Sequence, residues 1–427
     1  MILIVALISL SQPIIYAQFN RDSTGLTVNQ VSESLIQRYI DPDVGHRMAE
    51  ILNANLKLGK YDRIASGQEL ANQLTLDVRS IFDDRHLVIY YSAKELEKLN
   101  GFATQLTEQQ QLERFETMKK EQFGLKKVAI LEGNIGYLDF KYFGPLDYSG
   151  ELIVKAMDTL SSTNALIIDL RSCTGSMSED FNLLFPGYFL SRSVLLSTTS
   201  YRLPKQAKQN WSYGYVPGKK YLNKPVYILT SGGTFSGAEA LAYCLQALKR
   251  ITIVGDVTGG AANPVGSITL NNHFGINMPE ASVTNAITKT NWETVGVIPE
   301  LKVPARDALR IAHLVALDTI MKTKPEKWKP EYSLIVEKLK ADKPLTKLVQ
   351  FSLEGYQDAK SVSVAGDFNY WGRHTNQLER NNKGGWSIRI EVPKGKIRYR
   401  FMVDNQKVLD PLNPEKEDNV NVKIVKE

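Results

Sequence analysis

The chain has 427 residues, of which 43% are hydrophobic and 23% are charged, and its 52 basic and 46 acidic residues leave a net charge of only +6. This length suits two or three domains that each bury a core, and the composition is that of a folded protein rather than a disordered one. The basic residues form no long block and no ladder with aromatic residues, so we do not expect nucleic acid as a partner.

The first residues of the chain have the features of a signal peptide. Residues 1–17, MILIVALISLSQPIIYA, are uncharged and mostly apolar, and they end at a small residue before a polar segment. Such a stretch is too short for a transmembrane helix, and the alternative of a buried N-terminal strand fits it less well. We therefore expect a secreted or periplasmic protein with no transmembrane span.

Residues 18–92 predict an N-terminal helical domain. Apolar residues recur at helical spacing within residues 28–39, 48–56 and 70–81, which indicates three amphipathic helices. The third follows Ser66-x-x-Glu69, a pattern typical of a helix start. A short strand is expected over residues 87–91, and residues 93–125, rich in Glu, Gln and Lys, predict a helical connector.

Residues 126–322 predict an α/β domain. Gly133-Asn134 lies between two strand-like runs and suits a tight hairpin. The apolar runs ALIIDL, PVYILT and ITIVG are short and bounded by turns, with helical patterns between them, as in a buried parallel sheet. Further short strands are expected over residues 267–270 and 274–278, and an Ala- and Leu-rich helix over residues 305–321 closes the domain.

The last third of the chain changes in character. The stretch KTKPEKWKPEYSL is rich in Lys and Pro, and we interpret residues 323–345 as a linker. Beyond it, LVQFSLEG, SVSVAGDF, WSIRIEV, IRYRFMVD and VNVKIVK alternate polar and apolar residues between turns. Residues 346–427 therefore predict a small immunoglobulin-like β-sandwich.

The segment with the clearest chemical potential surrounds Ser236. In PVYILTSGGTFSGAEALAY, a buried strand leads through a glycine-bearing turn into a helix that Ser236 opens. Unpaired N–H groups and the positive end of the helix dipole at such a position can stabilise an oxyanion. Ser236-x-x-Glu239 is also an ordinary capping box, and this segment taken alone favours that structural role.

Three other segments carry candidate residues. Gly175 lies in DLRSCTGS after a buried strand, at the sheet edge where ligands bind in α/β proteins. His86 lies in FDDRHLVIYY, and Glu293 lies in NWETVGVIPEL. Taken singly, these residues are most simply a turn glycine, a structural histidine and a solvated glutamate.

Taken together, these segments resemble the C-terminal processing or tail-specific peptidase family, in the branch that contains tricorn core domains and interphotoreceptor retinoid-binding protein repeats. The resemblance covers residues 28–322: TSGGTFSGAEALAY resembles the nucleophile block, DLRSCTGS the oxyanion strand and NWETVGVIPEL the closing motif. It implies a ClpP/crotonase-like α/β serine peptidase core with no metal and no cofactor. It also implies Ser236 as the nucleophile and the N–H groups of Gly237 and Gly175 as the oxyanion hole.

The resemblance also implies which residue is the base. Relatives of the Ser-Lys type have a lysine twenty-five positions after the serine, and that position is Ala261 here. The tricorn-like branch instead uses a histidine before the core and a glutamate near the closing motif, which His86 and Glu293 match. An imidazole can accept the serine proton while a carboxylate orients it. Because Arg85 replaces the serine that precedes this histidine in tricorn-like sites, Glu293 is expected to contact His86 directly or through water.

The two cysteines, Cys173 and Cys244, are too few for a disulfide framework or a metal site, and the sequence leaves open whether they pair. Cys173 could in principle be a thiol nucleophile. Its position at a strand end favours a packing role instead.

The C-terminal segment resembles the glycogen-binding, early-set modules of starch-active enzymes and of AMP-activated kinase β subunits. Trp371 matches a tryptophan on which those modules stack a sugar ring, and Arg400 lies near a position that is usually basic. Lys407 stands where a second stacking tryptophan is expected. Polysaccharide binding and a role as a spacer or partner-docking domain both remain open.

These interpretations predict an exported serine peptidase that acts on a peptide or protein substrate through an acyl-enzyme. Two alternatives stay open. The chain could be a non-catalytic relative that binds a peptide or a lipid, or it could be mainly a polysaccharide-binding protein.

Overall fold

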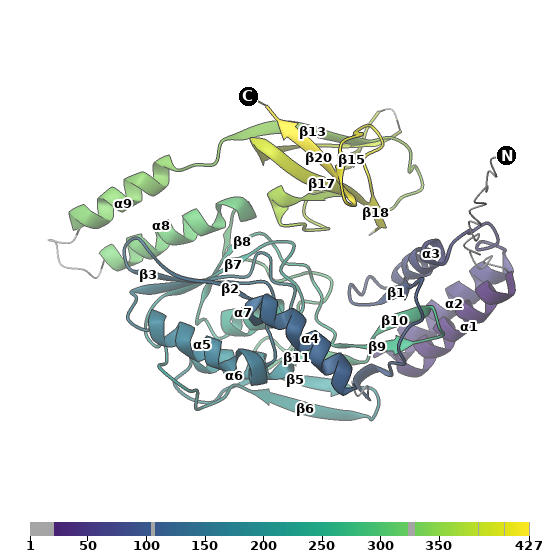
Figure 1. Cartoon of the computed structure of the whole chain (residues 1–427), viewed down its shortest axis with the longest axis horizontal. Coiled ribbons are helices and arrows are strands. Elements are labelled where there is room, and N and C mark those ends of the chain that lie inside the picture. The colour runs from purple at the N-terminus through teal and green to yellow at the C-terminus, as the bar shows by residue number, and fades with distance from the viewer. Residues whose placement is uncertain (1–20, 104–106, 323–328, 383, 405, 427) are drawn as a thin grey trace, which may run out of the picture.

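The structure is a computed structural model that describes residues 21–103, 107–322, 329–382, 384–404 and 406–426, so the predicted signal peptide lies outside the described residues. In the view of Figure 1, the N-terminal helices lie to the right of a central α/β region and the C-terminal strands lie above it. No helix within the described ranges has both the length and the apolar character needed to cross a membrane.

The three predicted N-terminal helices are confirmed as α1 (Arg21–Arg38), α2 (Pro42–Lys57) and α3 (Gly67–Arg79). The Asp41 side chain caps α2, and Ser66 caps α3 by accepting a hydrogen bond from the Glu69 N–H. The helices bury one apolar cluster together with residues of two core strands, and its members include Val28, Val31, Leu35, Leu52, Leu70, Leu74, Val78, Ile276 and Met278. The helical region is therefore packed directly on the core.

A small sheet makes that connection. Strand β1 (Val88–Tyr91), which the sequence predicts, pairs antiparallel with β10 (Phe274–Pro279), and β10 pairs with β9 (Val265–Thr269). The last two correspond to the short strands expected in this part of the chain. The pairing joins segments that lie far apart in the sequence, and it attaches the residues just before β1 to the core.

The central sheet has the order β12-β8-β7-β4-β3-β2. Its strands are β2 (Leu125–Leu131), β3 (Ile135–Phe140), β4 (Ala165–Asp169), β7 (Val226–Thr230), β8 (Thr252–Gly255) and β12 (Leu301–Lys302). Only the β2–β3 hairpin is antiparallel, and the parallel strands β4, β7 and β8 are the three predicted apolar runs. Gly133 and Asn134 have φ angles of 79° and 60°, as a tight hairpin turn requires.

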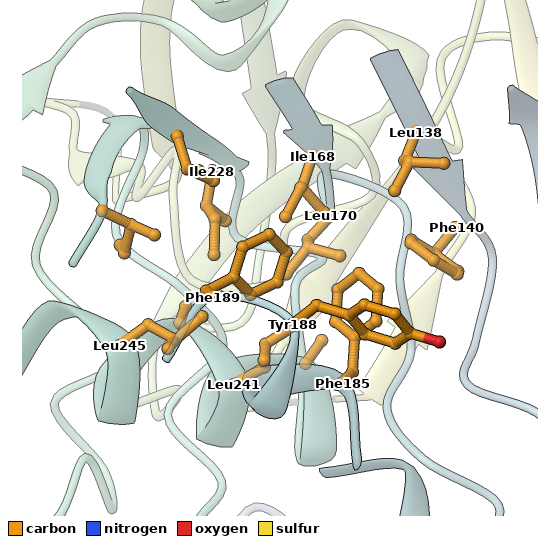
Figure 2. Packing of buried hydrophobic residues seen from close by; sticks show 14 of the residues in the cluster. Leu138, Phe140, Ile168, Leu170, Phe185, Tyr188, Phe189, Ile228, Leu241 and Leu245 are labelled. Atoms are coloured by element: carbon orange, nitrogen blue, oxygen red, sulfur yellow. The ribbon is translucent and has the colours of Figure 1, made fainter. Parts of the chain in front are cut away.

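Both faces of this sheet are buried, which explains why its strands are continuously apolar. One face packs on α5 (Leu146–Leu160), α6 (Glu179–Gly187) and α7 (Gly237–Ala247), and Figure 2 shows Leu138, Ile168 and Ile228 on this side, above Leu241 and Leu245. The other face packs on α8 (Ala308–Met321) and α9 (Lys329–Ala341). The predicted closing helix corresponds to α8.

Two regions differ from the expectations. Helix α9 falls inside the stretch interpreted as a linker, where the Lys and Pro residues obscured the helical spacing of Tyr332, Ile335 and Leu339 that pack on α8 and the sheet. A separate antiparallel sheet of β5 (Leu195–Tyr201), β6 (Gln206–Trp211) and β11 (Ala281–Asn285) was not predicted. Its strands are rich in Ser, Thr, Asn and Gln and so lack a clear apolar alternation. The expected helical connector contains α4 (Glu108–Lys120).

The C-terminal strands form the predicted sandwich. One sheet contains β13 (Thr346–Leu353), β16 (Trp386–Pro393) and β15 (Glu379–Arg380). The other contains β14 (Val362–Gly366), β17 (Gly395–Val403), β20 (Val420–Val425) and β19 (Lys416–Glu417), with β18 (Gln406–Val408) on β17. Trp386 is buried between the sheets and donates its indole N–H to the Tyr356 carbonyl.

The sandwich packs closely on the turn that follows β7. A side chain at Gly233 would place its first carbon 2.3 Å from the Tyr370 carbonyl oxygen, so only glycine fits at this contact. The guanidinium of Arg171, which is paired with Asp169, lies 4.7 Å from the centre of the Tyr370 ring. Arg306 adds a hydrogen bond to the Glu391 carbonyl oxygen. The sandwich is thereby held against the carboxyl ends of β4 and β7.

We predict that Ile228→Ala lowers the free energy of unfolding by about 2–5 kcal/mol, because it opens a cavity in a closely packed cluster around a fully buried side chain. Urea denaturation followed by circular dichroism would measure this loss. Ile130, whose side chain is 51% exposed in β2, gives the matched control: Ile130→Ala should cost less than about 1 kcal/mol. Equal losses for the two variants would contradict the described packing.

Candidate functional site

Ser236 occupies an unusual backbone position. Strand β7 ends at Thr230, the chain turns, and Ser236 directly precedes α7 with φ 53° and ψ −122°. This combination is rare and strained for any residue with a side chain, and such strain occurs mostly at functional sites. The Ser236 hydroxyl makes no capping hydrogen bond to the helix. The purely structural role that the segment alone favoured is therefore not the role its hydroxyl has.

A buried glutamate holds this turn in place. Glu239 accepts hydrogen bonds from the backbone N–H groups of Ser236 (2.8 Å), Gly260 (2.6 Å) and Ala261 (3.0 Å), and from the Thr258 hydroxyl (2.5 Å). Burial raises the pKa of Glu239 to about 7, although these hydrogen bonds oppose the shift. The sequence marked Glu239 only as part of a capping box. Its contacts with the loop at residues 258–261 are tertiary and carry no sequence signal.

Gly175 and Gly237 lie at Ser236, as the resemblance implies. A side chain at Gly175, where φ is 122°, would place its first carbon 2.9 Å from the Ser236 Cβ and 3.3 Å from the Gly237 nitrogen. The backbone hydrogen bonds in the described part of the chain include none from the N–H group of either glycine. The loop after β4 therefore lies directly against the start of α7, with two backbone donors that are not used within the fold.

His86 lies just before β1 and is 9% exposed. Its ring contacts the Phe235 ring edge to face, with 5.0 Å between the ring centres, so it lies next to the residue that precedes Ser236. The buried Nδ1 atom has no hydrogen-bond partner. Burial lowers the pKa of His86 to about 4, and the positive charge of Arg79 adds to this effect. The imidazole is therefore neutral at physiological pH.

Glu293 lies close to His86 but is not hydrogen-bonded to it. Its Oε2 atom accepts the backbone N–H groups of Ala262 (2.6 Å) and Asn263 (3.0 Å), and its buried Oε1 atom has no partner. Burial is the main cause that raises the pKa of Glu293 to about 8, and the nearby Asp84 carboxylate raises it further. Glu293 is thus protonated at neutral pH.

Asp84 is a member of this group that the sequence did not identify. Asp84, His86 and Glu293 each have one potential ligand atom that lies within 4.8 Å of those of the other two. Asp84 accepts hydrogen bonds from the backbone N–H of His86 (3.1 Å), the Asn263 side chain (3.0 Å) and the Tyr39 hydroxyl (3.2 Å). Burial raises the pKa of Asp84, and these hydrogen bonds oppose that shift. The position of Asp84 two residues before His86 was the one sequence feature that could have indicated it.

The predicted residues form two groups that the structure does not join by a hydrogen bond. Ser236 and Gly237 line one pocket of about 470 Å³, whereas His86 and Phe235 line another of about 470 Å³. Val265 lines both pockets. Within the described ranges, no hydrogen bond links His86 to Ser236 or to Glu293.

Asp84, His86 and Glu293 together offer one nitrogen and two carboxyl oxygens. Such a set of atoms could bind a divalent cation, or it could serve as a proton-transfer site without a metal. The two uses predict different responses to a metal chelator.

The cysteines take no part in this site. Cys173 and Cys244 are both buried and both free, so they do not pair. Burial raises the pKa of the Cys173 thiol to about 12. Because only a thiolate is a strong nucleophile, Cys173 has the packing role that its position favours.

The two predicted carbohydrate-binding residues lie next to the His86 pocket. Trp371 and Arg400 both line it, and the Arg400 guanidinium lies 5.2 Å from the centre of the Trp371 ring. The Trp371 indole N–H donates to Asp367 at 3.2 Å. Trp371 therefore lies at a pocket to which all three regions of the chain contribute.

Family comparisons agree with this three-part organisation. Residues 18–124 match the N-terminal domain of Peptidase S41 in eukaryotic IRBP, residues 134–303 match Peptidase family S41, and residues 349–424 match the glycogen recognition site of AMP-activated protein kinase. The predicted family resemblance and the predicted fold class are thereby confirmed.

Individual relatives are distant. A carboxy-terminal-processing protease from Bartonella bacilliformis is 25% identical over 179 residues, which are 40% of this chain and 39% of that protein. The match thus spans about two fifths of the relative's length. A putative peptidase structure from Parabacteroides merdae has a TM-score of 0.46 and 16% identity, covering 69% of this chain and 96% of its own. The tricorn protease has a TM-score of 0.44 and 10% identity, covering 74% of this chain and 37% of its own.

We predict that Glu239→Gln destabilises the protein by about 1–3 kcal/mol or more, because the amide NH₂ would face backbone N–H donors where a carboxyl oxygen now accepts them. Thermal or urea unfolding would measure the loss. Glu151, whose side chain is 90% exposed, provides the control, and Glu151→Gln should leave stability nearly unchanged. A Glu239→Gln variant as stable as the native protein would contradict this account of the turn.

Proposed function

We propose that the chain is an exported serine peptidase that cleaves peptide or protein substrates through an acyl-enzyme on Ser236, and the match of residues 134–303 to peptidase family S41 supports this proposal. The observation that carries the proposal is the strained turn that presents Ser236 at the start of α7, with its hydroxyl free of a capping bond and Gly175 directly against it. Export is proposed from the signal-like residues 1–17.

His86 is the proposed base. The serine oxygen would attack the carbonyl carbon of the scissile bond while His86 takes the hydroxyl proton, and His86 would then pass that proton to the leaving amine. Water would hydrolyse the resulting ester by the same exchange. This step requires the imidazole to reach the hydroxyl, and the contact of His86 with Phe235, which directly precedes Ser236, supports their closeness.

The two carboxyl groups have different proposed roles. Asp84 accepts three hydrogen bonds and is the better site for a negative charge, which would stabilise the imidazolium that forms during the reaction. Glu293 would orient the ring by accepting the Nδ1–H group of His86 at its unpartnered Oε1 atom, which keeps the Nε2 atom free to take the serine proton. The negative oxygen of the tetrahedral intermediate would bind the N–H groups of Gly175 and Gly237.

The pocket at Ser236 supports a peptide substrate with a large apolar side chain near the scissile bond. Its lining is mainly apolar and comes from α6, α7, β5, β11 and neighbouring loops, including Leu183, Leu196, Leu241, Val283 and Trp292. An apolar side chain of the substrate would be removed from water in this pocket, as in other concave binding sites. A non-catalytic relative that binds a peptide or lipid would use the same pocket but would not need the hydroxyl of Ser236.

We predict that the protein is labelled covalently by a fluorophosphonate probe and that Ser236→Ala abolishes this labelling. His86→Ala should slow labelling about 100-fold or more, since the serine would lose its base. Gel fluorescence over a time course would measure both effects. Ser200→Ala, which changes an exposed serine of β5, serves as the control.

Two results would contradict the proposal. The first is native protein that does not react under conditions in which a control serine hydrolase does. The second is labelling that depends on metal and is removed by EDTA, which would favour a cation at Asp84, His86 and Glu293.

We also predict an unusually acidic limit for activity. A base must be neutral to accept a proton, and His86 with a pKa of about 4 stays neutral until the pH falls through that value. The ratio kcat/KM should therefore persist well below pH 6.5, the ordinary histidine value. Arg79→Gln removes a positive charge that lowers this pKa, so it should move the acidic limit to higher pH, whereas Arg47→Gln, on an exposed site of α2, should not. An acidic limit near 6.5 in the native protein would contradict the described burial of His86.

A further inference from the structure

The pocket that His86 lines is bounded by all three regions of the chain. Arg79 and Arg85 come from the end of α3 and the loop before β1, Thr174 and Gly233 come from the core, and Arg373 comes from the sandwich. Its wall contains four arginines and two histidines: Arg79, Arg85, His86, Arg373, His374 and Arg400. Among the described residues, no aspartate or glutamate lines it.

Most of the arginines on this wall lack a carboxylate partner within the described ranges. The Arg79 guanidinium donates to the backbone oxygens of Leu87 and Arg85. The Arg400 Nε atom is buried without a partner, and within the described ranges the Arg373 guanidinium forms no ion pair with a carboxylate. Arg85 is the exception, since its Nε atom lies 3.5 Å from an Asp83 oxygen.

The effects of these charges on one another show how closely they are gathered. Burial, together with the charges of Arg85, Arg373 and Arg79, lowers the pKa of His374 to about 3. Burial also lowers the pKa of Arg400, and Arg373 adds to the shift. Gathering like charges in a partly buried pocket costs free energy, and an anionic ligand would remove that cost.

The position of the pocket relative to Ser236 indicates which ligand it would meet. Phe235 lines the cationic pocket, the next residue, Ser236, lines the apolar pocket, and Val265 lines both. In the loop that lies against them, Thr174 faces the cationic pocket and Ser176 the apolar one. A peptide that crosses Ser236 would therefore have an apolar pocket on one side of the nucleophile and a cationic pocket on the other.

We infer that the cationic pocket binds a carboxylate of the peptide substrate, and that the sandwich takes part in substrate binding by supplying Arg373 and Arg400. This inference rests on the proposed function. Guanidinium groups match the two oxygens of a carboxylate and bind it with charge-assisted hydrogen bonds. A neutral glucan would leave the positive charges uncompensated and would have to displace the Arg400 guanidinium from the Trp371 ring.

The test uses the full chain carrying Ser236→Ala, so that binding is measured without cleavage. Fluorescence anisotropy would compare peptides with N-acetyl and C-terminal amide ends that contain one leucine and one glutamate at varied spacing, each with a partner peptide that has glutamine in place of glutamate. We expect the glutamate peptide to bind about 10-fold more tightly at one or more spacings. A peptide without glutamate but with a free C-terminal carboxylate distinguishes the two sources of the charge.

Substitution of Arg373 should remove the preference for the glutamate peptide. Arg373→Gln in the same background should make the glutamate and glutamine peptides bind equally, and 0.5 M NaCl should weaken the preference because salt screens charges. Arg373 is itself exposed and forms no ion pair within the described ranges, so its loss should not unfold the protein. Arg389→Gln, an exposed arginine of β16 away from the pocket, is the matched control and should keep the full preference.

The outcomes separate this inference from the proposed function. No preference for a carboxylate, or a preference that Arg373→Gln leaves unchanged, overturns the inference even if the native protein is labelled by the serine probe. Binding of polygalacturonate that depends on Arg373, with no preference among peptides, also overturns it. Tight binding of carboxylate peptides by a chain whose native form does not react with the probe would support the binding site and would contradict the catalytic proposal.

Discussion

The pairing of β1 with β10 is the contact on which the arrangement of this molecule depends. The ladder from Val88–Asn277 to Tyr91–Phe274 ties the helical region to the core immediately after His86. Strand β1 also packs against apolar residues of α3, so the strand pairing and the helical packing support one another. This register and the hydrogen bond from the Asn263 side chain to Asp84 position Asp84 and His86 relative to Glu293, which is held from the other side by the N–H groups of Ala262 and Asn263.

Much of the fold could be predicted because its signals are local. The turn at Gly133-Asn134, the apolar runs of β4, β7 and β8, and the alternation in the sandwich strands each lie within a short window. Helix α9 and the sheet of β5, β6 and β11 were missed because their composition conceals their periodicity. The stacking of Tyr370 on Arg171 joins segments nearly two hundred positions apart, and no pattern in either segment indicates the other.

The sequence indicated some members of the candidate site but not their surroundings. The family resemblance indicated Ser236, His86 and Glu293, and the structure places the last two near each other and Gly175 at Ser236. It also adds Asp84 and Glu239, whose importance comes from the donors that fold around them. Burial disfavours the charged form of both residues: it lowers the pKa of His86 and raises the pKa of Glu293, so that a neutral ring and a neutral acid are favoured. Sequence alone contains no measure of burial at a site assembled from three regions.

The close packing of Tyr370 on Gly233 has a consequence for how such a molecule can change over time. Because an appended sandwich forms part of the surroundings of the serine turn, substitutions in the sandwich can alter what approaches the turn while every residue of the core stays the same. Under the proposed function, selectivity for a substrate can then vary through the sandwich while the residues around Ser236 stay unchanged. A related core without the sandwich would present the same serine turn in a wider and less basic setting.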